Sequence, residues 1–100
     1  MDYIFIVNPK SRTGQGELLW SQLEPELKKR RISYEVRMTG RKKDAERIAA
    51  EITADKEEHT MIVLGGDGSL NEVINGIKNP SKVMLGYIPT GSSNDFARGM

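Results

Sequence analysis

Residues 61–77 read MIVLGGDGSLNEVINGI, and this segment decides the fold of the chain. Four apolar residues lead into the turn Gly65-Gly66-Asp67-Gly68, and apolar residues then recur at helical spacing as far as Ile77. This pattern predicts a strand, a tight turn and a helix. Glycine lets a ligand approach the backbone, and the first amides of a helix lack internal partners, so the turn can bind phosphate. Because Asp67 would repel a bare phosphate, we expect a cation such as Mg²⁺ between them.

Composition limits the class of protein. One hundred residues suffice for one domain, which would bury roughly two-thirds of its unfolded surface. Fifteen Lys plus Arg against fourteen Asp plus Glu leave no overall field for nucleic acid or an anionic membrane. The absence of cysteine excludes disulfides, and one histidine cannot build a zinc site. This composition fits a reducing cytoplasm. The apolar run at residues 3–7 is too short for a signal peptide, so we expect Met1 to be the true start.

That apolar run predicts a first strand covered on both faces, and a polar loop follows it. Residues 8–16, NPKSRTGQG, combine turn formers, two cations, hydroxyls and two glycines, and form a second candidate phosphate loop. They lack the Gly-Lys-Ser/Thr of a Walker A loop, and a dinucleotide fingerprint would need glycine where Leu19 stands. A plain polar connection is an equally good interpretation of this segment.

The rest of the chain alternates between helical and strand patterns. Leucines at four-residue spacing predict a helix over residues 16–30, and Pro25 predicts a kink near Ser21 or two abutting helices. We further expect strands over residues 32–38 and 83–88, a helix over 43–54, and a short helix beginning at Asp95. The basic groups at residues 28–31 and 41–43 are best interpreted as solvated surface, and His59 is assigned no role.

This alternation predicts a three-layer αβα domain with a mostly parallel sheet. The loops of interest all follow strands: residues 8–16, Thr39, residues 65–69 and residues 90–93. In right-handed βαβ units such loops lie together at the carboxyl edge of the sheet, where open α/β sheets bind ligands. Thr39 taken alone is better explained as a turn or cap residue. The convergence of four loops favours a nucleotide-binding edge.

Three segments together resemble the diacylglycerol kinase catalytic-domain family, in its bacterial lipid kinase branch. They are residues 8–11 (NPKS), 65–73 (GGDGSLNEV) and 89–98 (PTGSSNDFAR), and the resemblance covers essentially the whole chain. The GGDG unit alone is shared with NAD kinases and phosphofructokinases, whereas its NEV context and the NDFAR segment are specific. The resemblance implies a phosphofructokinase/NAD kinase-like nucleotide domain and phosphorylation of a lipid hydroxyl that depends on ATP and Mg²⁺.

The resemblance also implies roles for individual residues. It assigns nucleotide contacts to Asn8, Lys10, Ser11, Thr39, Gly65, Gly66, Asp67, Gly68, Ser69, Leu70, Asn71, Glu72, Gly91 and Ser92. It places Asp67 and Asp95 in an acidic, metal-linked network, and the sphingosine kinases suggest Asp67 as the general base. Three positions depart from the family: Ser69 replaces a common threonine, Ser93 a common glycine, and Arg12 stands where glycine is frequent.

In this family a second, β-rich domain carries the lipid site and further catalytic carboxylates. We therefore expect residues 1–100 to be a truncated nucleotide-binding portion of a cytoplasmic lipid kinase. Its expected partners are ATP, a lipid alcohol and, for the parent protein, a peripheral membrane contact, but no nucleic acid. Apolar surface left without that domain predicts self-association. Two alternatives stay open: a kinase of another small molecule, with NAD kinase nearest, and a non-catalytic module that binds nucleotide or a partner chain.

Overall fold

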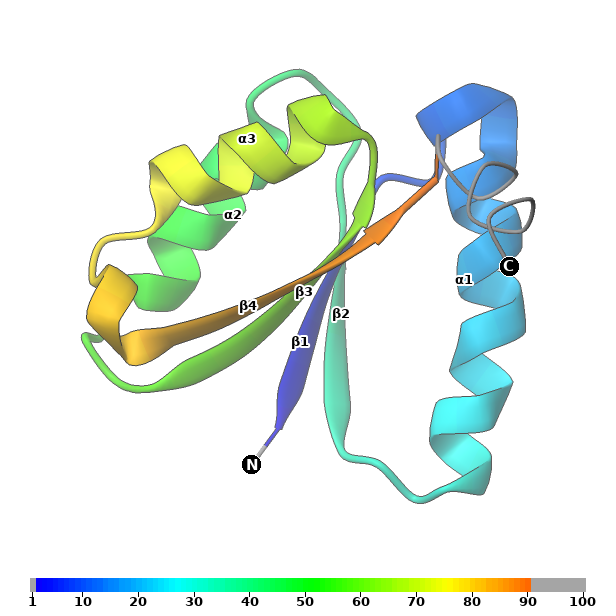
Figure 1. Ribbon diagram of the computed structural model, residues 1–100, viewed down its shortest axis with the longest axis horizontal. Helices are drawn as coiled ribbons and strands as arrows, with labels where there is room; N and C mark the ends of the chain where they lie inside the picture. The colour runs from blue at the N-terminus through cyan, green and yellow to red at the C-terminus, as the bar shows by residue number, and fades with distance from the viewer. Residues whose placement is uncertain (1, 91–100) are drawn as a thin grey trace, which may run out of the picture.

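The computed structural model describes residues 2–90, which form one parallel sheet with helices on both faces (Figure 1). The strands are β1 (Tyr3–Val7), β2 (Tyr34–Met38), β3 (His59–Gly65) and β4 (Val83–Pro89). The helices are α1 (Ser11–Lys29), α2 (Asp44–Thr53), α3 (Asp67–Gly76) and a short 3₁₀ helix, η1 (Pro80–Lys82). The strand order is β2-β1-β3-β4, and every pair is parallel.

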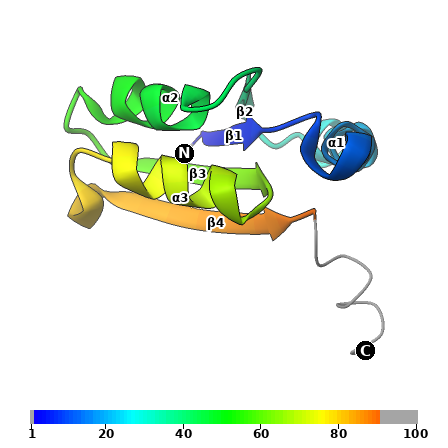
Figure 2. The ribbon, with the colours of Figure 1, turned by 90° about the horizontal axis from the view of Figure 1, so that it is seen from above.

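Two apolar cores lie on opposite faces of the sheet, one beneath α2 and α3 and the other beneath α1. Figure 2 shows these helices from above. On one face, Ile6 and Met61 pack with Ile48 of α2 and Val73 of α3. The continuous apolar runs of β1 and β3 supply side chains to both cores, as expected for strands covered on both sides. The three-layer αβα prediction is therefore confirmed.

The other face is covered by α1, which differs from expectation at Pro25. Helical dihedrals continue through Pro25, and the interruption lies instead at residues 12–14, where φ is positive. The predicted alternative of two abutting helices at Pro25 is therefore wrong, and the kink near Ser21 stays a prediction. A proline inside a helix costs about 3 kcal/mol. Trp20 and Leu27, on either side of Pro25 in sequence, are buried. Burial of a large apolar side chain stabilises by roughly 1.5–3 kcal/mol, so these two side chains can offset the cost of the proline.

The helices α2 and α3 are packed so closely that a side chain at Gly76 has no room. A Cβ atom there would lie 2.2 Å from the carbonyl oxygen of Glu46 in α2. Just beyond α3, the backbone N–H of Lys78 donates to the buried Thr53 hydroxyl at 3.0 Å. The two helices therefore form one layer, which fixes the loop before α2 relative to the start of α3.

The remaining boundaries agree with the sequence to within about two residues, except that the helix predicted from Asp95 lies outside the described residues. Strands β1 and β3 are neighbours, while the connections that leave them run over opposite faces of the sheet. This is a topological switch point, and in open α/β sheets ligands bind beyond the carboxyl ends of the strands at such a point.

Candidate phosphate-binding site

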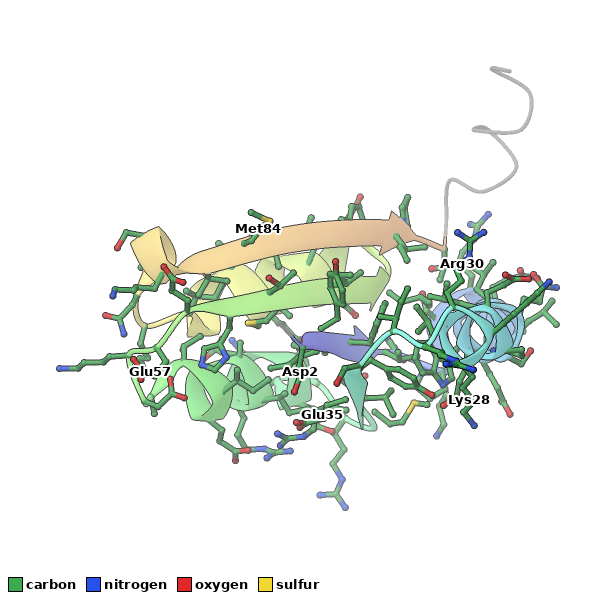
Figure 3. The ribbon with its side chains drawn as sticks, turned by 90° about the horizontal axis from the view of Figure 1, so that it is seen from below. Asp2, Lys28, Arg30, Glu35, Glu57 and Met84 are labelled. Atoms are coloured by element: carbon green, nitrogen blue, oxygen red, sulfur yellow. The ribbon has the colours of Figure 1, made fainter. Side chains whose placement is uncertain are left out.

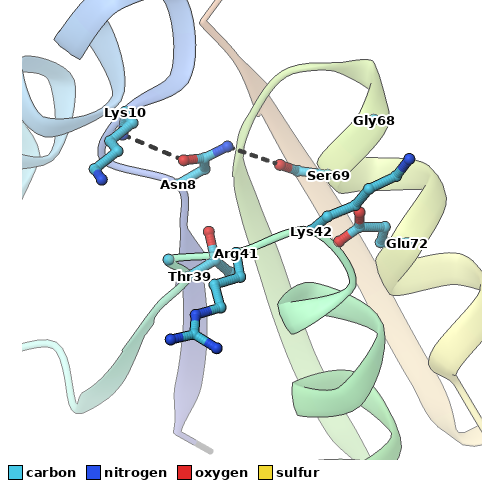
Figure 4. A pocket seen from close by; sticks show the side chains of 9 residues that line it. Asn8, Lys10, Thr39, Arg41, Lys42, Gly68, Ser69 and Glu72 are labelled. Atoms are coloured by element: carbon cyan, nitrogen blue, oxygen red, sulfur yellow. Dashed lines mark hydrogen bonds between the residues drawn. The ribbon is translucent and has the colours of Figure 1, made fainter.

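A cavity of about 330 Å³ lies at this switch point (Figure 4). Its walls come from the loops after β1 and β2 and from the first turns of α3. It is lined by Asn8, Lys10, Thr39, Gly40, Arg41, Lys42, Gly68, Ser69 and Glu72. The predicted convergence of the loops after β1, β2 and β3 at one sheet edge is therefore confirmed.

Asn8 connects the two sides of the cavity. Its side-chain nitrogen donates to the Ser69 hydroxyl over 3.4 Å, and its side-chain oxygen accepts the backbone N–H of Lys10 over 3.2 Å. A Cβ atom at Gly16 would lie 1.9 Å from the carbonyl oxygen of Asn8, so only glycine allows α1 to approach this loop. Asn8 thus sets the position of Lys10 relative to α3.

The loop between β2 and α2 forms a basic wall. Thr39 is 8% exposed; its backbone N–H donates to the carbonyl oxygen of Val7 at 2.9 Å, which anchors the loop to β1. Arg41 and Lys42 follow and line the cavity. Figure 4 shows the Lys42 side chain extending toward α3, while that of Arg41 points away from α3. Residues 41–43 are exposed, as the interpretation as solvated surface predicts, but that interpretation missed that Arg41 and Lys42 line the cavity. Their place soon after Thr39 was the available signal.

Helix α3 begins at Asp67 without a side-chain cap on its N-terminus. Its first backbone N–H groups, at Asp67, Gly68 and Ser69, have no partner within the helix, as at any helix start. The Asp67 carboxylate accepts a hydrogen bond from the Tyr87 hydroxyl of β4 at 2.9 Å. Burial raises the pKa of Tyr87, and the bond to Asp67 raises it further, so this phenol stays protonated and donates.

The charge of the cavity favours an anion. Three cationic side chains line it, those of Lys10, Arg41 and Lys42, against the one carboxylate of Glu72. Glu72 also accepts the backbone N–H of Lys43 at 3.1 Å. The partial positive charge at a helix N-terminus adds to this field. The arrangement can hold a group with several negative charges.

The remaining predicted site residues are not among those that line the cavity. The hydroxyls of Ser11 and Thr90 share a hydrogen bond, which joins the first loop to the end of β4. Leu70 packs against the core under α3, and Asn71 is exposed. Gly65, Gly66 and Asp67 adjoin the cavity in sequence but are not among its lining residues. Gly91, Ser92 and Asp95 lie outside the described residues.

Comparison with known proteins identifies the family. The family described as "Diacylglycerol kinase catalytic domain" matches residues 2–100. The chain belongs to this family. It is 39% identical over 100 residues to a diacylglycerol kinase of Staphylococcus haemolyticus and 35% identical over 99 residues to a candidate lipid kinase of Bacillus subtilis. These alignments cover 95% and 97% of this chain, but only 29% and 32% of the relatives.

Solved structures agree with the family assignment. A diacylglycerol kinase from Bacillus anthracis superposes with a TM-score of 0.71 at 31% identity, over 97% of this chain and 35% of that chain. This chain therefore spans about a third of the length of the relatives that it matches. Within residues 2–90, no helix is both long and apolar enough to cross a membrane.

Proposed function

We propose that this chain provides the nucleotide-binding part of a lipid kinase that uses ATP and Mg²⁺. The observation that carries the proposal is the cavity lined by Lys10, Arg41 and Lys42 together with the first turns of α3. Cationic side chains and a helix N-terminus together suit a polyphosphate. The names of the relatives supply the reaction class, transfer of a phosphoryl group to diacylglycerol or a similar lipid alcohol.

The residues present also suit a magnesium ion. Mg²⁺ usually takes one or two carboxylates and completes its shell with water and substrate phosphates. Asp67, at the start of α3, would be one such ligand, and Asp95 is the second predicted one. Within residues 2–90 no three acidic or histidine side chains gather into a metal site. The nucleotide and water would therefore have to supply most of the ligands. When bound, the ion would neutralise phosphate charge.

The chain's own residues would act mainly by positioning. Phosphoryl transfer proceeds in line, and its catalysis comes chiefly from orientation and charge stabilisation. Lys10 and Lys42 would hold the phosphates, and the amides of α3 would orient them. Asp67 is also the proposed general base for the lipid hydroxyl. The acceptor site and further catalytic carboxylates are proposed to lie in a second domain.

Calorimetry with MgATP tests nucleotide binding. We expect the wild-type chain to bind, and Lys10→Ala to weaken binding roughly tenfold, because one charge-assisted contact is lost. Lys28→Ala is the matched control, since Lys28 lies in the last turn of α1, away from the cavity lining. Absence of heat with the wild type, or equal affinity for all three proteins, would contradict the proposal and favour the non-catalytic alternative.

A transfer assay tests the acceptor. The protein, expressed with its natural flanking sequence, is given ATP labelled at the terminal phosphate together with diacylglycerol, sphingosine and NAD. We expect label in a lipid. Label found only in NADP would reject the lipid kinase and support the NAD kinase-like alternative.

A further inference from the structure

We propose that Asp44 is a positioning residue for phosphate binding, because its carboxylate shapes the loop of residues 40–43, the basic wall of the cavity. This inference rests on the proposed function. Asp44 is absent from the lining of the cavity, so its effect would be transmitted through the loop.

The first observation is a pair of short hydrogen bonds to one carboxylate oxygen. The backbone N–H groups of Gly40 and Arg41 both donate to Oδ2 of Asp44, over 2.7 and 2.8 Å. These bonds fold the loop back on the start of α2 and lower the pKa of Asp44, because they favour its charged form. The loop conformation therefore depends on an acceptor at this position.

The second observation concerns the far end of the same loop. Lys43 adopts a left-handed conformation with φ of 75°, which is uncommon for a residue with a side chain. Its backbone N–H donates to Oε2 of Glu72 on α3 at 3.1 Å. Such a conformation persists only where surrounding contacts impose it. Asp44 and Glu72 thus hold the loop at its two ends.

Between these two anchors lies Lys42, which lines the cavity and extends toward α3 (Figure 4). A lysine on a free loop would lose conformational entropy when it bound a phosphate. A loop that is already held avoids much of that cost. Asp44 would therefore strengthen the binding of a polyphosphate without touching it.

The chain offers matched variants. Asp44→Ala removes the acceptor, whereas Asp44→Asn keeps an oxygen that can accept both N–H groups and loses only the negative charge. Arg47→Ala removes the ion pair of Arg47 Nη2 with Oδ1 of Asp44 at 3.5 Å and leaves the two bonds to Oδ2 in place. Circular dichroism and melting curves would establish that each variant is folded.

Two measurements test the inference. Amide hydrogen exchange reports on the loop: Asp44→Ala should lose protection at Gly40 and Arg41, while Asp44→Asn and Arg47→Ala keep it. Calorimetry with MgATP, tripolyphosphate and adenosine reports on binding. Asp44→Ala should weaken the two phosphate ligands roughly tenfold and leave adenosine unchanged, and Asp44→Asn should restore most of the affinity.

The outcomes separate the inference from the function on which it rests. Unchanged protection in Asp44→Ala, or wild-type affinity for MgATP and tripolyphosphate, overturns the positioning role even where wild type binds ATP. Equal weakening by all three variants also overturns it, because the change they share is loss of the Asp44–Arg47 ion pair, and the acceptor at Oδ2 would then not be what matters. A wild-type chain that binds neither MgATP nor tripolyphosphate rejects the proposed function, and the phosphate role of Asp44 with it.

Discussion

The hydroxyl of Tyr87 donates a hydrogen bond to Oδ1 of Asp67 over 2.9 Å, which connects β4 to the first residue of α3. This bond fixes one oxygen of the carboxylate that we propose as a metal ligand and general base. Removing it should leave Asp67 free to rotate, at a cost in stability of no more than about 1.5 kcal/mol, the usual contribution of one hydrogen bond.

Tyr87→Phe is therefore expected to raise the Mg²⁺ concentration needed for half-maximal ATP binding several-fold. Calorimetry across a magnesium series would measure this shift. Tyr34→Phe is the control, because it loses a similar bond, from its hydroxyl to Oε2 of Glu24 at 2.6 Å, away from the cavity lining. The same magnesium dependence in both variants would argue against a role for Tyr87 at the site.

Gly76→Ala should destabilise the domain. The added Cβ would lie 2.2 Å from the carbonyl oxygen of Glu46, so α2 and α3 would have to separate, at roughly 1–3 kcal/mol. Urea unfolding would measure the loss. Gly68→Ala, in the first turn of the same helix, has no atom within 4 Å of the new Cβ and should be neutral or stabilising by up to about 1 kcal/mol. Equal stability of the two variants would refute this account of the packing.

Stability should fall in acid. The pKa of Asp44 is lowered, chiefly by the hydrogen bond that it accepts from the backbone N–H of Gly40. The pKa of Glu51 is lowered, chiefly by the hydrogen bond from the guanidinium of Arg37. A carboxyl group whose pKa is lower in the folded than in the unfolded protein stabilises the fold at pH values above its unfolded pKa, which is about 4. This stabilisation is lost as the pH falls through the pKa of the folded state. Urea midpoints should therefore be level from pH 7 to about 5 and decline below. Asp44→Asn should decline less steeply; an identical slope would contradict the assignment.

Self-association is expected through β4. In the described part of the chain β4 has a neighbouring strand on one side only, and Met84 on it is 70% exposed (Figure 3). An unpaired strand edge with an exposed apolar side chain can pair with the same strand of a second copy. Light scattering at high concentration should give a mass above one chain, and Met84→Lys should lower it. Met38→Lys on β2, the other edge strand, is the control and should have less effect, because Met38 is less exposed than Met84, at 49%.

Local sequence patterns determined most of the strands and helices of this protein. Uninterrupted apolar runs predicted strands covered on both faces, and the turn at residues 65–68 predicted the start of α3, because these signals act over a few neighbouring residues. Strand and helix alternation then allowed only a few topologies, which is why the loops could be assigned to one sheet edge. The family motifs added candidate contacts that spacing alone did not distinguish from ordinary turns.

Tertiary structure decided what local patterns left open. Pro25 remains inside α1 because Trp20, which precedes it, and Leu27, which follows it, both pack against the sheet. Helix propensity takes no account of this packing. Residues 41–43 have the composition of solvated surface. Arg41 and Lys42 nevertheless line the cavity, and we attribute this to Asp44 and Glu72, 28 positions apart in sequence, which accept hydrogen bonds from the backbone of one loop. Such contacts depend on how α2 and α3 pack together, and no local pattern in the sequence predicts them.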